Sequence, residues 1–304
     1  MKMKMKKFKL HTGISEIYRI STETYEKAVA NNPNYIHTGR DNVKRYFAVC
    51  PACDNPIQLI GLYKKLENTD RPYGRHYNRD TKIAKHNEQA YRFCPYASHS
   101  YGVTKKSIKD EMTEYEENIY NGVRENFDLA VYIMKQDTGI LFSKKILGEI
   151  LRGYLSTEAY MYYWATPYNI PWMLLYFMGE IPCYGLRVKK ECELWDYLSS
   201  RTDVKFIQSG VDGYDQVINN GKFLNLYLTF LFHKRQVIDD EVKETLSLVL
   251  TSRKENGDSQ RVHEIILDIN EYRFPNLVCS AKYRDQTLLD LAKEVLPDLS
   301  ISNG

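Results

Sequence analysis

The stretch Tyr46-Phe47-Ala48-Val49-Cys50-Pro51-Ala52-Cys53-Asp54-Asn55-Pro56-Ile57-Gln58-Leu59-Ile60 decides the fold of the N-terminal part of the chain. Its two ends are short apolar runs with strand-like composition, and a Cys-Pro-x-Cys turn stands between them. A tight Cys-x-x-Cys turn presents two thiolates from one corner of the backbone, which suits a tetrahedral Zn²⁺ ion. The proline inside the turn stiffens that corner. The pattern therefore predicts a β-hairpin that carries half of a zinc site.

The other half of the predicted site has to come from further along the chain. Cys94, in Cys94-Pro95-Tyr96, supplies a third thiol, so the remaining ligand is a histidine. We favour His76, because its aromatic neighbours indicate an ordered, partly buried position. His99 is the rival, because its spacing from Cys94 recurs in compact zinc sites, whereas His86 stands in a polar, exposed segment.

The predicted site is structural rather than catalytic. Four protein ligands close the coordination sphere, whereas a catalytic zinc keeps one position open beside a general base. Neither His-x-Glu nor His-Glu-x-x-His occurs around these cysteines. We therefore expect one structural Zn²⁺ as the cofactor, held by Cys50, Cys53, His76 and Cys94. The alternative is that the cysteines are reduced core residues without a metal.

Residues 46–99 resemble a zinc ribbon with a rubredoxin-type knuckle, through the hairpin that carries Cys-Pro-x-Cys. The resemblance implies a small zinc-binding β module, here within residues 41–102. It covers no other part of the chain. The second half departs from the pattern, because such modules usually have another Cys-x-x-Cys where this chain offers only Cys94.

The formal net charge of +3 hides a division along the chain. Residues 1–109 contain 21 Lys and Arg against 9 Asp and Glu, and the rest contains 21 against 30. A basic segment attracts phosphates, and between the metal ligands tyrosines alternate with cations, a combination that suits nucleic acid. The plainer alternative is a small module that covers its exterior with charged side chains. The cations predicted to contact DNA or RNA are Lys64, Lys65, Arg71, Arg75, Arg79, Lys82 and Arg92.

Several features argue against a secreted or membrane protein. Cys183, Cys192 and Cys279 lie in apolar surroundings and indicate reduced thiols. The N-terminal charges are followed by polar residues before an apolar signal-peptide core can form. No apolar run approaches the roughly 18–20 residues of a membrane span. We expect a cytoplasmic protein with no membrane partner.

Periodicity predicts an α+β fold in four parts. These are a basic lead-in with one short helix at 1–40, the zinc-ribbon-like module at 41–102, a helical region at 103–200, and an antiparallel β-meander with a terminal helix at 201–304. The expected helices cover 23–30, 107–134, a segment after Ser143, a segment from Thr157 through Trp164, a segment after Asn169, 189–198 and 285–295. The expected strands are 224–232, 245–251 and 262–270, and in the first of them Leu224, Leu226, Leu228, Phe230 and Phe232 should point inward.

No catalytic motif stands out elsewhere. The sequence contains no P-loop, dinucleotide-binding glycine pattern, nucleophile elbow or kinase loop. One set offers the components of a metal-dependent nuclease, but we interpret it as a solvated connection between strands: His233, Asp239, Asp240, Glu241 and Lys243. An aromatic cluster suits core or interface packing better than a ligand pocket: Tyr160, Tyr162, Tyr163, Trp164, Tyr168 and Trp172.

The leading hypothesis is a bacterial or phage-type protein, regulatory or related to defence or counter-defence, whose zinc-stabilised basic module binds nucleic acid. The helical and C-terminal parts then serve assembly or regulation. The first alternative is a non-catalytic protein whose zinc serves folding only and which binds another protein through the aromatic helical region. The second alternative is a nuclease with an unrecognised site, so no enzymatic activity is assigned.

Overall fold

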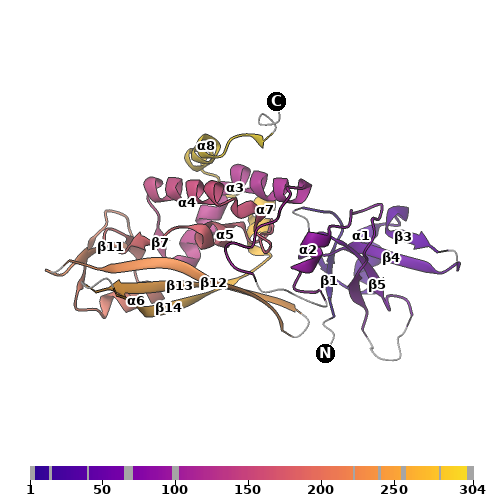
Figure 1. The fold of residues 1–304 in the computed structure, drawn as a ribbon, viewed down its shortest axis with the longest axis horizontal. Coiled ribbons are helices and arrows are strands. Elements are labelled where there is room, and N and C mark those ends of the chain that lie inside the picture. The colour runs from indigo at the N-terminus through magenta and orange to yellow at the C-terminus, as the bar shows by residue number, and fades with distance from the viewer. Residues whose placement is uncertain are drawn as a thin grey trace. The chain divides into compact units, whose positions relative to one another are not determined.

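The computed structural model of the chain confirms the α+β fold, with antiparallel sheets, helices in the middle of the chain and a helix near its C-terminus (Figure 1). It describes residues 4–13, 16–39, 41–64, 71–97, 103–221, 223–238, 241–254, 258–280 and 282–299. The chain divides into two compact units. Unit 1 consists of Met1–Ile119, Tyr160–Tyr168 and Arg235–Lys243, and unit 2 of Tyr120–Ala159, Asn169–Lys234 and Glu244–Gly304.

A six-stranded antiparallel sheet lies at the centre of unit 1. Its strand order is β2-β1-β4-β5-β6, and β3 also pairs with β4. An isolated bridge between Met5 and Gly74 joins the N-terminal segment to β6. The strands are β1 Lys7–Lys9, β2 Ile17–Arg19, β3 Ile36–Thr38, β4 Lys44–Val49, β5 Pro56–Ile60 and β6 Tyr73–His76.

Strand alternation decides which side chains of this sheet enter the core. Ala48 of β4 and Ile57 and Leu59 of β5 point inward and are almost fully buried, together with Phe8 of β1. Helix α1, Thr22–Val29, packs into the same cluster. The opposite side of the sheet is also covered in part, because Phe47 and Val49 of β4 are buried there.

Residues 1–40 hold more regular structure than the sequence indicated. The expected short helix is α1, and Ser21 caps it by accepting a hydrogen bond of 3.1 Å from the backbone N–H of Thr24. The same residues also supply β1, β2, β3 and a 3-10 turn at Pro33–Tyr35. Each of these strands has 3 residues, too few for an alternation pattern to be recognised.

Two helix predictions in the middle of the chain differ from the structure for the same reason, one at its start and one over its whole length. Helix α3 begins at Glu114 rather than at Ser107, and the segment after Thr157 forms only a 3-10 turn at Ala159–Met161. The backbones of 107–109 and 161–163 pair with each other instead, through a bridge and hydrogen bonds of 2.9 and 3.1 Å. The helices are α2 Glu88–Arg92, α3 Glu114–Thr138, α4 Lys144–Ser156, α5 Ile170–Phe177, α6 Glu193–Ser199, α7 Arg273–Ser280 and α8 Gln286–Val295.

The other helix predictions are confirmed to within a few residues. Ser143 caps α4, and Pro171 stands in the first turn of α5. Asp285 caps α8, which ends before Pro297. Helix α6 starts later than expected, because Arg187–Lys189 belongs to a strand, β9.

Two further antiparallel sheets of four strands follow in the sequence. The sheet β14-β13-β12-β8 contains the three strands expected from alternation. The sheet β10-β11-β9-β7 was not expected, because its strands are short and carry mixed polarity. The strands are β7 Ile140–Leu141, β8 Ile181–Pro182, β9 Arg187–Lys189, β10 Val204–Gln208, β11 Tyr214–Asn219, β12 Leu226–Ile238, β13 Glu241–Arg253 and β14 Ser259–Ile269.

The alternation predicted for β12 is confirmed as far as Phe230 and is wrong at Phe232. Leu226, Leu228 and Phe230 are fully buried, whereas Phe232 is 45% exposed. Its φ of 55° is left-handed, and the strand changes phase there, so that His233 points inward instead. A single irregular residue thus reverses the faces of the second half of the strand.

Candidate metal centre

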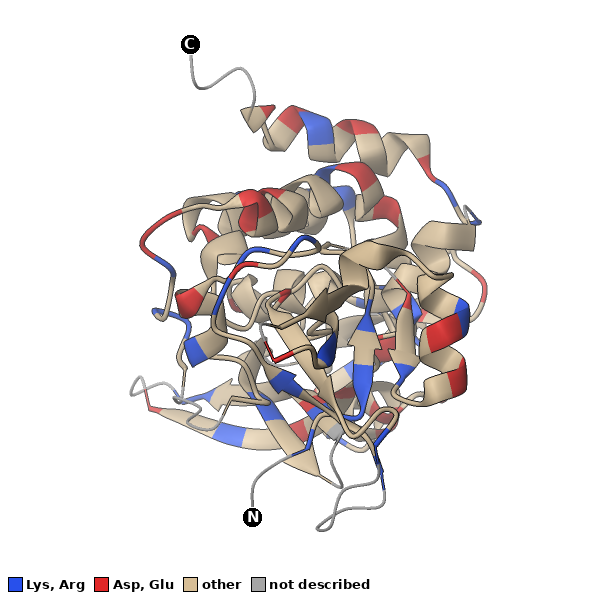
Figure 2. Cartoon of the chain, turned by 90° about the vertical axis from the view of Figure 1, so that its right-hand side faces the viewer, with Lys and Arg blue, Asp and Glu red and all other residues tan. Residues whose placement is uncertain are grey.

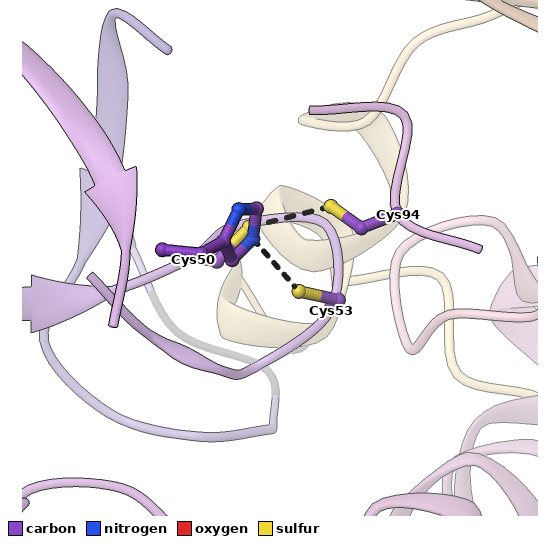
Figure 3. A group of neighbouring side chains, drawn as sticks. Cys50, Cys53 and Cys94 are labelled. Atoms are coloured by element: carbon purple, nitrogen blue, oxygen red, sulfur yellow. Dashed lines mark hydrogen bonds between the residues drawn. The ribbon is translucent and has the colours of Figure 1, made fainter. Parts of the chain in front are cut away.

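Three thiols and one imidazole meet in unit 1. The candidate ligand atoms of Cys50, Cys53, His76 and Cys94 all lie within 4.8 Å of one another. Figure 3 shows Cys50 and Cys53, which belong to one turn, close to Cys94 from another segment of the chain. The Sγ atoms of Cys50 and Cys94 are 3.8 Å apart, and Cys53 Sγ lies 3.3 Å from His76 Nε2. The four side chains selected from the sequence are therefore neighbours in the structure.

Two of the distances between candidate ligand atoms match the edges of a tetrahedral metal site, and the group as a whole spans up to 4.8 Å. Zn–S bonds of about 2.3 Å and Zn–N bonds of about 2.0 Å place two sulfurs about 3.8 Å apart, and sulfur and nitrogen about 3.5 Å apart. The observed distances, 3.8 Å between the sulfurs of Cys50 and Cys94 and 3.3 Å between Cys53 Sγ and His76 Nε2, are close to these values. A disulfide needs about 2.05 Å between its sulfurs, and the three cysteines are free thiols. The group can hold one metal ion.

Local hydrogen bonds fix the turn that carries the first two cysteines. The N–H of Cys50 donates to the carbonyl of Asn55 at 2.8 Å, and the carbonyl of Cys50 accepts from the N–H of Asp54 at 3.1 Å. Asp54 has a left-handed φ of 57°, a conformation that Asp tolerates better than most residues. Strands β4 and β5 pair on either side of the turn, as the predicted hairpin requires.

The other two candidate ligands come from β6 and from the segment after α2. His76 is the last residue of β6 and pairs with Ile57 of β5. Its ring packs edge-on against Tyr91 of α2, with the ring centres 5.0 Å apart. The N–H of Cys94 donates to the carbonyl of Tyr91 at 3.0 Å. Tyr91 therefore positions the histidine and the third cysteine together.

Two asparagines that sequence reasoning missed join these segments. Asn55 Nδ2 donates to the carbonyl of Asn87 at 3.0 Å, and the N–H of Asn87 donates to Asn55 Oδ1 at 2.7 Å. The Asn87 side chain also caps α2, by accepting from the N–H of Ala90 at 2.9 Å. Asn55 Nδ2 lies 3.4 Å from Cys53 Sγ, where it can stabilise negative charge on the sulfur. In the sequence, the only indication of this link is a polar residue two positions after Cys53, and that residue alone does not identify Asn87 as its partner.

Burial and mutual contact change the protonation of these groups. Burial raises the pKa of the Cys50 thiol well above its usual range, and the neighbouring thiols add to the effect. Burial by itself would also raise the pKa of the Cys53 thiol. The hydrogen bonds of Cys53 with Cys50 and Cys94, together with the charge of His76, outweigh burial and lower this pKa. Burial lowers the pKa of His76, but the charges of Cys53 and Cys94 outweigh burial and raise that pKa. The cluster favours a thiolate beside an imidazolium, and a divalent cation takes the place of such protons when it binds.

A buried ion pair supports the turn from β1. Lys9 pairs with Asp54, and their side chains are 0% and 8% exposed. The Lys9 ammonium also donates to the carbonyl of Gly13 at 2.9 Å and to the hydroxyl of Tyr168 at 2.8 Å. Burial acts to lower the pKa of Lys9, but Asp54 and Tyr168 outweigh it and raise that pKa. Burial raises the pKa of Asp54 against the opposing effect of Lys9. The residue after Cys53 is thus fixed to the neighbouring strand.

The cations predicted to contact nucleic acid lie on several parts of unit 1. Arg75 belongs to β6. Arg92 ends α2 and forms an ion pair with Glu88 at 3.3 Å. Lys65 lies outside the described residues, as does the rival histidine, His99. The remaining cations are exposed residues of loops and bends: Lys64, Arg71, Arg79 and Lys82.

In the set considered as a nuclease site, His233 does not belong to a solvated connection. This residue is buried, and its Nε2 lies 2.7 Å from Glu244 Oε1. The same oxygen accepts from Asn169 Nδ2 at 2.6 Å, so the three side chains link β12, β13 and the start of α5. Asp239 and Asp240 lie outside the described residues. The expectation for His233 failed because the change of phase at Phe232 cannot be predicted from alternation.

The aromatic cluster packs in the core, as expected. Tyr162 and Trp172 are fully buried. The indole N–H of Trp164 donates to the carbonyl of Phe93 at 3.0 Å, and that of Trp172 to Asp137 Oδ2 at 3.0 Å. Both polar edges therefore have partners within their own unit, and the rings stabilise the fold.

No protein-family model, curated protein or solved structure matches the chain. Fold and site together define an α+β protein with a buried cluster of three cysteines and one histidine in its N-terminal unit. Among the helices of the described ranges, none combines the length and the apolar composition needed to cross a bilayer. The function has to be argued from the geometry of the chain itself.

Proposed function

We propose that the chain is a nucleic-acid-binding protein in which a structural Zn²⁺ ion supports a basic, aromatic sheet surface. The alternation in Tyr73-Gly74-Arg75-His76-Tyr77 carries this proposal. Gly74 is buried and His76 reaches the metal centre, whereas Arg75 is exposed. Because side chains alternate between the two sides of a strand, Tyr73 and Tyr77 project on the same side as Arg75. One strand thus presents a metal ligand inward and two rings with a cation outward.

Neighbouring strands extend this outer surface. Arg75 pairs with Gln58 of β5, and Gln58 pairs with Phe47 of β4. The guanidinium of Arg75 lies 3.4 Å from the side-chain oxygen of Gln58, and the rings of Phe47 and Tyr77 pack at 5.0 Å. These contacts place the four side chains on the side of the sheet opposite to the core. We name Phe47, Gln58, Tyr73, Arg75 and Tyr77 the outer face; within it Phe47 is buried and supports the Tyr77 ring from below.

Positive charge accompanies the rings of the outer face. The Lys4 ammonium lies 5.6 Å from the centre of the Tyr73 ring. Within the described part of the chain, Arg75 has no carboxylate partner. Figure 2 shows lysines and arginines, in blue, on neighbouring strands of this unit. Cations contact phosphates and rings stack on bases, so the combination suits a single strand of nucleic acid.

The donor set suits zinc in a structural role. Thiolate and imidazole ligands in a tetrahedron are the usual donors of structural zinc, and four protein ligands leave no position open for catalysis. A bound ion would hold β6 between the 50–53 turn and the segment after α2. The hairpin and its cysteines also support the resemblance to zinc ribbons over residues 46–99. The proposal is therefore a zinc-dependent binding surface without an enzymatic activity.

Fluorescence anisotropy with labelled oligonucleotides tests this proposal. Zinc-loaded protein is titrated with single-stranded and duplex DNA and RNA at increasing salt, and binding should weaken as salt rises because phosphates release counterions on binding. Tyr73→Ala should weaken binding about 5- to 150-fold, since stacking contributes about 1–3 kcal/mol per base. Arg75→Ala should weaken it and reduce the salt dependence. Arg187→Ala is the matched control, since Arg187 is an exposed arginine on β9 in unit 2.

Two results would contradict the proposal. If zinc-loaded wild-type protein binds none of the oligonucleotides at low salt, the zinc serves folding only, and a protein partner becomes the better interpretation. If Tyr73→Ala and Arg75→Ala bind like the Arg187→Ala control, the outer face is not the binding surface. Zinc content, measured on each variant, must equal that of the wild type for either comparison to count.

A further inference from the structure

A pocket of about 580 Å³ lies within unit 1, and Cys53 of the metal centre contributes to its wall. The rest of the wall comes mainly from two segments, the loop at 81–87 before α2 and residues 113–118 at the start of α3. Pockets of roughly 300–1,000 Å³ accommodate small ligands. Neither the metal ligands nor the outer face accounts for this cavity.

The lining of the pocket combines apolar residues with two exposed cations. Ile83, Ala84 and Ala90 supply apolar surface. Lys82 and Lys85 also line the pocket, and both are exposed. A flat ring can pack against the apolar wall while a phosphate attached to it contacts the lysines.

Several polar groups in the pocket are not used by the fold. Within the described residues, the side chains of Thr12 and Asn118 make no hydrogen bond. His86 Nε2 lies 3.1 Å from the Glu88 carboxylate, but His86 Nδ1 is buried without a hydrogen-bond partner in the same part of the chain. Buried polar atoms normally have partners. Thr12 is exposed and Asn118 is half-buried, so both can hydrogen-bond to solvent or to a ligand, whereas the buried His86 Nδ1 indicates a ligand with a hydrogen-bonding edge.

We infer that this pocket takes one unstacked nucleotide of a bound nucleic-acid strand, an inference that rests on the proposed function. Lys82 and Lys85 contact the phosphate, and Ile83 and Ala90 pack against the base. Asn118 hydrogen-bonds to an edge of the base, because its amide can both donate and accept. Proteins that recognise single strands commonly read bases that have left the stack. The pocket then supplies base preference, while the outer face supplies general affinity.

The acidic residues of the pocket are compatible with a nucleotide. Asp54 lines the wall, but Lys9 neutralises its carboxylate. Glu114 is exposed and lies one helical turn before Asn118 on the same face of α3. A carboxylate in that position can accept a hydrogen bond from an amino group or a ribose hydroxyl. The two lysines leave the lining positively charged overall.

Calorimetric titration of the zinc-loaded full chain with nucleoside monophosphates tests the inference, with inorganic phosphate as the reference probe. At least one monophosphate should bind about tenfold more tightly than phosphate, since base recognition adds hydrogen bonds and apolar contact. Asn118→Ala should weaken that binding about fivefold or more. Lys85→Ala, a change at an exposed site, should weaken both the monophosphate and phosphate. Asn276→Ala, an exposed asparagine of α7 in unit 2, is the control.

The outcomes separate the pocket from the outer face. Monophosphates that bind no better than phosphate overturn the inference, and so does unchanged binding in both Asn118→Ala and Lys85→Ala. If oligonucleotides depend on Tyr73 and Arg75 while the pocket fails these tests, the proposed function stands and the pocket inference falls. If monophosphates bind through Asn118 while no oligonucleotide binds, the pocket is a site for free nucleotides, and both the proposed function and the inference of a bound strand fall.

Discussion

Lys9→Met is the sharpest test of the packing that supports the metal centre. The substitution removes the ammonium and keeps a long side chain in a position that is 0% exposed. Within the described residues, the Asp54 carboxylate then keeps one donor, the N–H of Gly13 at 2.7 Å. The hydroxyl of Tyr168 also loses the ammonium that donated to it at 2.8 Å. A buried carboxylate is left without a counter-charge.

The expected loss follows from that uncompensated charge. Removing one partner of a buried ion pair typically costs about 3–5 kcal/mol of unfolding free energy, because the other charge stays buried. The double variant Lys9→Met with Asp54→Asn removes both charges and should recover most of the loss. Asn tolerates the left-handed φ of 57° at this position, and its side-chain oxygen can still accept from Gly13.

Urea unfolding followed by ¹⁹F NMR of 5-fluorotryptophan measures this effect within unit 1. The chain has 3 tryptophans, and Trp164 is the one that lies in unit 1. The Trp164 resonance, assigned with Trp164→Phe, should lose its folded signal at lower urea in Lys9→Met. Arg45→Met, which breaks an exposed pair with Asp41, should change the midpoint little. A midpoint for Lys9→Met no lower than for Arg45→Met, or a double variant less stable than the single one, refutes the reasoning.

Three further predictions concern the metal centre and the core. Asn55→Ala should lower zinc affinity about 10- to 100-fold in a chelator competition while one ion still binds at saturation, because it removes the amide beside the sulfur. Gly74→Ala should cost about 1–3 kcal/mol in the same ¹⁹F assay, because a methyl group there would lie 2.9 Å from Cδ1 of Ile57. Burial raises the pKa of Cys183 to about 12, so at pH 8 a thiol reagent should modify exposed Cys279 and spare Cys183. An unfolded thiol ionises near pH 8.5, so the stability that the neutral Cys183 thiol contributes is fully present below that pH and is lost as pH rises toward 12. Rapid modification of Cys183 in the folded protein would contradict this prediction.

The local half of the metal centre could be predicted because its signal lies in contiguous residues. Two apolar runs around Cys-Pro-x-Cys are enough to indicate a hairpin, and the structure pairs them in register from Tyr46 with Leu59 to Val49 with Pro56. The remaining candidate ligands followed from the chemistry of zinc, which requires four donors. The aromatic surroundings that favoured His76 are present as its contact with Tyr91.

The supporting contacts could not be predicted, because they join single polar residues that are distant in the sequence. Lys9 meets Asp54 and Asn55 meets Asn87 without any periodic pattern that connects them. A lysine in a basic N-terminal run reads as a solvated charge, yet Lys9 is fully buried. The same limit applies to the pairing of 107–109 with 161–163, where tertiary hydrogen bonds replace the helices that local periodicity indicated.

The alternation of β6 would give a bound metal ion a role beyond holding unit 1 together. β6 has 4 residues and includes a glycine, so its own side chains specify its register only weakly. A slip of one residue would turn Arg75 toward the core and His76 outward. A bond between a metal ion and His76 would exclude that slip, because the imidazole would have to stay on the side of Cys53 and Cys94. A bound ion would therefore determine which side chains form the outer face, and it would tie the proposed binding surface to the candidate metal centre through one strand.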